Sequence, residues 1–146
     1  MAIKQSEKAK GREATVTSYV HGARMVQIST YQFSENFVAA NDKLELGLLP
    51  ADAQLVGAQL IGENIGSVNA TIGLMSGQPG DTDDARTVGS QLANAAAAGS
   101  GPVVATTLAC LNVAKSNVHR SVGVTFSGNI TAAANRKVTL VLEYVH

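Results

Sequence analysis

Apolar and polar side chains alternate with a period of two residues in short segments along the whole chain. This period places successive side chains on opposite faces of a β-strand. Val122, Val124 and Phe126 share one face of such a segment, and Leu140 and Leu142 share a face of the last one. The segments predicted as strands are 14–20, 24–33, 43–49, 53–61, 68–75, 103–110, 121–130 and 137–145. The sequence therefore predicts an all-β fold.

The connections between these segments are rich in Gly, Asn and Pro, which are turn residues. The longest of them allows one short helix over 83–99, with Asp83 as N-cap, Val88 and Leu92 on one face and Gly99 as the stop. About eight strands with long connections favour a jelly-roll-like antiparallel β-sandwich over an up-and-down barrel. We expect one such domain over residues 13–146, with the short helix in a long connection.

One predicted strand carries apolar side chains on both of its faces. In segment 53–61, Val56, Ala58 and Leu60 share one face while Leu55 and Ile61 lie on the other. A strand of this kind is covered on both sides, here by the protein's own core on one side and by a local loop or a second protein on the other. Together with the last strand, this gives four candidates for self-association: Leu55, Ile61, Val141 and Val145.

The charge balance excludes several classes of partner. Charged residues make up only 15% of the chain and cancel to a net charge of +0. Such a surface creates no field that attracts nucleic acid or an anionic membrane, and no apolar run approaches the ~20 residues of a membrane helix. The first twelve residues form a basic arm with Lys4, Lys8, Lys10 and Arg12. We expect this arm to be flexible, as a solvated tail or as a segment held by a partner.

No constellation of reactive side chains is recognisable. His21, His119 and His146 are far apart in the sequence, and the single cysteine, Cys110, excludes an intramolecular disulfide. No Gly-x-Ser-x-Gly nucleophile motif or phosphate-binding glycine loop is present. The sequence therefore predicts a protein that is not an enzyme and has no cofactor.

Three carboxylates cluster in the polar segment GDTDDAR: Asp81, Asp83 and Asp84. Oxygen ligands of this kind suit Ca²⁺, but the spacing does not match the EF-hand loop. A turn followed by a helix cap explains the same residues without a metal. We therefore predict no metal site and retain calcium binding as the alternative.

Two stretches resemble the cementing, or head-decoration, proteins of tailed bacteriophages. They are NDKLELGLLPADAQLVGAQLIGENIGSVNATIGLMSG and the closing RKVTLVLEYVH, which cover about residues 41–76 and 136–146. The resemblance lies in a strand ending in leucines, an LPA turn, an ATIGL strand and a final VTLVLEY strand. It implies a jelly-roll sandwich on the outer surface of a phage head, made in the host cytoplasm and assembled into the virion.

This resemblance also implies partners. The chain would bridge copies of the major capsid protein as a homo-oligomer, for which a dimer is the commonest closed symmetry. Our capsid-contact candidates are the arm and the loop 78–85, that is, Lys4, Lys8, Lys10, Arg12, Gln78, Asp81, Asp83 and Asp84. The alternative is a sugar- or receptor-binding sandwich module of a phage tail or fibre, because jelly rolls also form lectins.

Overall fold

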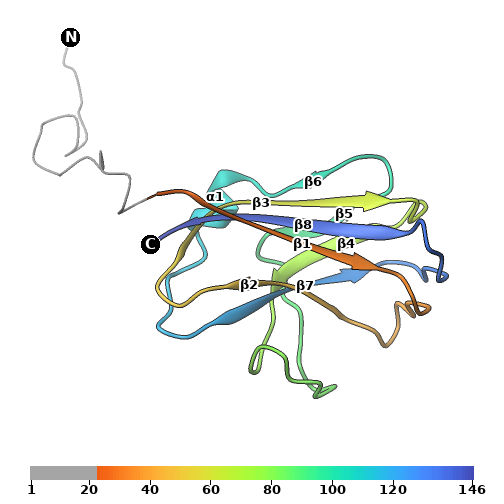
Figure 1. Ribbon diagram of the computed structural model, residues 1–146, viewed down its shortest axis with the longest axis horizontal. Coiled ribbons are helices and arrows are strands. Elements are labelled where there is room, and N and C mark those ends of the chain that lie inside the picture. The colour runs from red at the N-terminus through yellow and green to blue at the C-terminus, as the bar shows by residue number, and fades with distance from the viewer. Residues whose placement is uncertain (1–22) are drawn as a thin grey trace, which may run out of the picture.

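A computed structural model describes residues 23–146 and confirms the all-β prediction: in this part of the chain eight strands form two antiparallel sheets (Figure 1). The strands are β1 (Met25–Gln32), β2 (Leu44–Leu49), β3 (Gln54–Glu63), β4 (Asn69–Leu74), β5 (Ala93–Ala97), β6 (Val103–Val104), β7 (Arg120–Phe126) and β8 (Lys137–Val145). A short helix, α1 (Thr107–Leu111), lies between β6 and β7. The predicted strand 14–20 and the arm 1–12 lie outside the described residues.

The order of the strands is that of a jelly roll. The first sheet has the order β1-β8-β3-β6, and the second sheet has the order β2-β7-β4-β5. The pairs β1 with β8, β2 with β7, β3 with β6 and β4 with β5 are all antiparallel neighbours. The chain therefore follows one long hairpin that is wound into two stacked sheets, which is the double-sheet arrangement of a jelly roll.

The core lies between the two sheets and is built mainly from aliphatic side chains. β8 contributes Val138, Leu140 and Leu142, and β7 contributes Val122 and Val124, all of them fully buried or nearly so. These are the faces that the alternation predicts for both segments. Because each sheet buries only one face in this core, the opposite face of each is left for other contacts.

Three phenylalanines close one end of the core. Phe33 follows β1, Phe37 lies in the next connection, and Phe126 ends β7. Their rings meet edge to face, with centroids 5.3 Å apart for Phe37 and Phe126 and 6.3 Å apart for Phe33 and Phe37. Edge-to-face pairs are favourable because of the ring quadrupoles, so this cluster joins the two sheets at that end.

A regular strand over 43–49 would place Leu44, Leu46 and Leu48 on one face, but a β-bulge in β2 prevents this. The register with β7 shifts between Glu45 and Gly47. Such an extra residue reverses the alternation beyond it. Leu44 and Leu49 therefore face the core, whereas Leu46 is only partly buried and Leu48 is 36% exposed.

A second bulge, in β3, overturns the predicted outward position of Leu55. The register with β8 shifts between Leu55 and Gly57. As a result Leu55 shares the inward face with Ala58 and Leu60 and is 0% exposed. Leu55 belongs to the core and is not available for self-association.

The helix predicted over 83–99 is also wrong. Ala93–Ala97 form β5, which pairs with β4, and Asp83 lies in a turn and caps no helix. Pairing with β4 outweighs the helix propensity of the alanine run. The helix lies instead at Thr107–Leu111, where it replaces the second half of the predicted strand 103–110. The Thr106 side chain accepts a hydrogen bond from the Ala109 N–H and caps the helix.

We predict that Leu140→Ala lowers the free energy of unfolding by about 2–5 kcal/mol, because it opens a cavity between the sheets. The neighbouring Val141→Ala, on the half-exposed outer side of the same strand, should cost less than about 1 kcal/mol. Urea unfolding followed by circular dichroism measures both values. Equal losses for the two variants would contradict the position of the core.

Candidate functional site

The outer face of the first sheet carries a row of side chains that crosses all four strands and is apolar on three of them. Ile28 of β1 pairs with Val141 of β8, Val141 pairs with Gln59 of β3, and Gln59 pairs with Val104 of β6. Ile28 is 68% exposed and Val104 is 66% exposed. We call this surface, with Val26 and Ile61 beside the row, the outer face.

The outer face holds three of the four predicted self-association residues. Ile61, Val141 and Val145 are half-buried on it, whereas Leu55 is not part of it. Sequence reasoning missed Ile28 and Val104 as surface residues. Their alternation is visible in the sequence, but a strand's pattern does not say which of two apolar faces points outward.

A shallow hollow of about 190 Å³ lies on this outer face, between the row and the start of α1. Val56, Gly57, Val104 and Thr107 are among its lining residues. Arg24 and Glu143 form an ion pair at its rim. The outer face therefore combines apolar side chains with one neutralised charge pair, which is the composition of a protein contact surface rather than of a reactive site.

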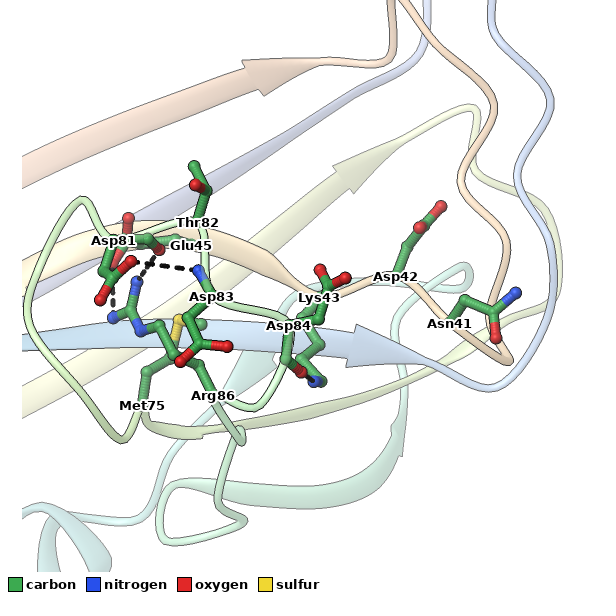
Figure 2. Close-up of a pocket in the computed structure, with 10 residues that line it drawn as sticks. All are labelled: Asn41, Asp42, Lys43, Glu45, Met75, Asp81, Thr82, Asp83, Asp84 and Arg86. Carbon is green, nitrogen blue, oxygen red and sulfur yellow. Dashed lines mark hydrogen bonds and ion pairs between the residues drawn. The ribbon is translucent and has the colours of Figure 1, made fainter.

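A second candidate surface is a hollow of about 280 Å³ between β2 and the loop that follows β4 (Figure 2). Four aspartates, Asp42, Asp81, Asp83 and Asp84, line it together with Lys43, Glu45 and Arg86. We call it the acidic hollow. The structure thus brings three of the four predicted loop residues to one place. Gln78 lies in a different hollow, beside Leu48 and Val118.

Arg86 holds the loop of the acidic hollow in place. Its side chain is 5% exposed. The Nε donates to the Ser76 carbonyl at 2.7 Å and Nη1 donates to the Asp81 carbonyl at 2.7 Å. Figure 2 shows the guanidinium directed between Glu45 and the 81–84 loop, and Nη2 lies 2.8 Å from Glu45 Oε2. Sequence analysis missed this role because a single Arg in a polar segment carries no pattern.

Glu45 is the anionic partner in this network. It accepts hydrogen bonds from the Ser121 hydroxyl at 2.5 Å and from the Gly80 N–H at 3.2 Å. Burial raises the pKa of Glu45, but the hydrogen bonds from Ser121, Arg86 and Gly80 and the positive charge of Arg86 outweigh it. The pKa of Glu45 therefore lies below its ordinary value.

The aspartates of the loop serve its turns. Asp81 Oδ1 accepts from the Asp83 N–H at 3.1 Å, and Asp83 Oδ1 accepts from the Ala85 N–H at 3.0 Å. These are Asx turns, in which a side chain replaces a backbone acceptor. Between residues 23 and 146, no group of three or more His, Cys, Asp or Glu side chains is placed to hold a metal ion. The turn interpretation of this segment is the one that the geometry supports.

The remaining reactive side chains have structural surroundings. His119 Nδ1 accepts a hydrogen bond from the Ala51 N–H at 3.0 Å. Cys110 is fully buried on α1, and burial raises the pKa of its thiol. In the described part of the chain, no helix has the length and apolar character needed to cross a membrane.

We predict that Glu45→Gln removes part of the pH dependence of stability. As pH falls, the unfolded chain takes up the Glu45 proton near the ordinary pKa of 4.5, whereas the folded protein takes it up only at lower pH. The contribution of Glu45 is therefore complete above pH 4.5 and is lost as pH falls through the folded-state pKa. Thermal melting at pH 7 and at pH 3 should differ less for Glu45→Gln than for the wild type, with Glu63→Gln, on the exposed end of β3, as the control.

Comparisons with known proteins find relatives among solved structures. A scan against protein-family models gives no match, and a search of curated proteins gives none either. A chain of the cyanophage Pam1 capsid asymmetric unit superposes with a TM-score of 0.63 at 20% identity, covering 99% of both chains, which shows a shared fold.

A stronger match comes from a chain in the capsid of Ralstonia phage GP4. It superposes with a TM-score of 0.77 at 33% sequence identity, and the alignment covers 99% of this chain and 98% of that one. The alignment therefore spans nearly the whole length of both chains. The protein belongs to the same family as this Ralstonia phage GP4 chain, a family of phage capsid proteins.

Proposed function

We propose that the protein binds the outer surface of an assembled phage head and bridges neighbouring copies of the major capsid protein. The observation that carries the proposal is the match, at 33% identity over 99% of this chain, to a chain of a phage capsid. The role is structural, so it requires an adhesive surface and no reactive group. The proposed place of action is the virion, and the proposed partners are the major capsid protein and further copies of this chain.

The stabilising mechanism is linkage. A protein that binds the assembled shell and not its separate subunits shifts the equilibrium toward the shell by its binding free energy. A contact of about 800 Å² on each partner is enough for a specific interface. Repetition of this contact over the icosahedral surface lets a modest affinity at each site resist the internal pressure of the packaged DNA.

Two charged elements support the contact with the capsid. The acidic hollow presents Asp81, Asp83 and Asp84 on a loop that Arg86 holds through a hydrogen bond to the Asp81 carbonyl. Loop preorganisation lowers the entropy lost on binding. The arm is positively charged through its four basic residues in 1–12. The arm therefore suits an acidic patch of the capsid, and the acidic hollow suits a basic one.

The outer face supports self-association. Its row of side chains, apolar except for Gln59, is flanked by a neutralised ion pair, so two copies can meet face to face without burying an unpaired charge. Ile61, Val141 and Val145 remain the predicted contact residues, and Ile28 and Val104 extend the surface. A two-fold pairing through this face would give the dimer.

The sugar-binding alternative has less support. Sugar sites commonly use an exposed aromatic ring as a stacking platform. In residues 23–146, the three Phe are buried, Tyr144 is 9% exposed, and Tyr31 packs against Phe33 with ring centroids 5.2 Å apart. No observation on this part of the chain favours a carbohydrate ligand over a protein surface.

The direct test is to incubate the purified protein with phage heads that lack it. We expect saturable binding, seen as a gain in particle mass, and a higher melting temperature of the shell, because the ligand binds only the assembled state. Disassembled capsid protein is the control and should bind little. Heads that neither gain mass nor melt later would refute the proposal.

We also predict that deleting residues 1–12, or replacing Lys4, Lys8, Lys10 and Arg12 together by Gln, weakens head binding about tenfold at physiological salt. Each exposed charge pair contributes only about 0.2–1 kcal/mol, so the effect needs several of them. It should shrink at 1 M salt, where charges are screened within about 3 Å. The melting temperature of the free protein is the control and should not change.

A companion variant tests the acidic hollow. Asp81→Asn, Asp83→Asn and Asp84→Asn together keep the size of the side chains and remove three negative charges. Binding isotherms on heads measure the effect against Glu35→Gln, an exposed acid in another connection. Unchanged affinity in both the arm and the loop variants would mean that neither element contacts the capsid.

A further inference from the structure

The sandwich has an open side where the edge strands of its two sheets lie next to each other. β1 ends the first sheet and β2 ends the second. The Gln27 side chain joins them, since its Nε2 donates to the Leu48 carbonyl at 3.0 Å and its Oε1 accepts from the Leu48 N–H at 2.9 Å. The backbone groups of Leu48 are thereby paired, so a further strand at this side would pair with β1.

A groove runs along this open side. One hollow of about 350 Å³ is lined by Gln27, Ser29, Leu46 and Leu48, among others. A second, of about 480 Å³, is lined by Leu48 and Val118, among others. The two share Leu48 and Pro79 and therefore lie next to each other. We call these two hollows together the edge groove; beyond the β2 bulge Leu48 points out of the core, and Leu46 is half-buried beside it.

β1 lacks the features that normally protect an edge strand. Natural edge strands carry charged residues, prolines or bulges that prevent further strand pairing. β1 is eight residues long, reads MVQISTYQ, and contains no charge, proline or glycine. Its pairing with β8 is also continuous, without a register shift. A long, regular and uncharged edge of this kind accepts an additional strand.

The chain itself contains a segment that fits the edge groove. Residues 14–20, ATVTSYV, are uncharged and alternate Val16 and Val20 with Thr15, Thr17 and Tyr19. As a strand, this segment would direct both valines, about 13 Å apart, into the groove that Leu46, Leu48 and Val118 line, and its threonines toward water. These residues precede β1 by only a few positions, so every copy of the chain carries both the groove and its ligand.

The direction of the groove favours a segment from another copy. β2 runs opposite to β1 (Figure 1), and Gln27, near the start of β1, contacts Leu48, near the end of β2. The Val118 half of the groove therefore extends past the start of β1, toward the end of the sandwich where the described chain begins (Figure 1). A segment folding back at His21-Gly22 would cover β1 and leave this half open, whereas an extended segment from a neighbour can follow both halves.

We propose that residues 14–20 of one copy add as a strand to β1 of a neighbouring copy and fill its edge groove. This exchange links copies through backbone hydrogen bonds, with Val16 and Val20 as the side-chain anchors. It is independent of capsid binding and uses a surface separate from the outer face. Experiments on the purified protein alone can therefore test the proposal.

The first test measures self-association of the full chain by sedimentation velocity over a range of concentrations. We expect the double variant Val16→Asp and Val20→Asp to weaken association at least tenfold, because both charges would be buried in the groove. The matched control is Thr15→Asp with Thr17→Asp, which adds the same charge on the opposite face. Circular dichroism of both double variants checks that each is folded.

The second test distinguishes exchange from folding back. A chain with Val16→Cys is mixed with a differently tagged chain with Leu48→Cys, and disulfides are formed under mild oxidation. We expect a disulfide-linked heterodimer, which Thr17→Cys in place of Val16→Cys should not give. The native Cys110 does not compete, because it is fully buried.

Three outcomes would overturn the proposal. The full chain could sediment as a monomer at every concentration, or the valine and threonine variants could associate equally. A chain carrying both Val16→Cys and Leu48→Cys could also close its disulfide only within one molecule, which would assign the groove to the chain's own segment. Because no capsid is present, none of these results bears on decoration of the head.

Discussion

The burial of one apolar face of each sheet against the other is the interaction on which the rest of the structure depends. β8 is central to it, because it lies between β1 and β3 and directs Val138, Leu140 and Leu142 into the core. With the core filled by aliphatic side chains on the inner faces, the outer faces are not needed for folding. The exposed apolar residues of the outer face and the edge groove are therefore a surplus, and in a family of phage capsid proteins a surplus of this kind is best explained by contacts between proteins.

The fold class and much of the core follow from the alternation in the sequence, because a two-residue period with one buried face is a direct consequence of strand geometry. Val122, Val124, Leu140 and Leu142 are buried as predicted. The errors arise where the backbone departs from regular geometry. Bulges near Gly47 and Gly57 reverse the alternation. A one-residue shift of this kind leaves no clear trace in the local sequence, yet it moves Leu55 inward and Leu48 outward.

The candidate site was less predictable than the fold, and Arg86 shows why. The aspartates of the loop are conspicuous in the sequence, but the residue that fixes the loop is a single arginine whose acceptors are mostly backbone carbonyls. Backbone acceptors have no sequence signature, and Glu45, its ionic partner, is 41 positions earlier in the chain. The helix prediction for the alanine run of residues 93–97 was wrong for a related reason: this segment forms a strand because β4 lies beside it.

The central place of β8 has a consequence for how local damage would spread through the sandwich. β1 pairs with β8 along its whole length, and β3 pairs with the other side of the same strand. A proline in the middle of β8 would remove a ladder hydrogen bond and distort the pairing with both neighbours. The same change in the edge strand β6 would disturb only its pairing with β3.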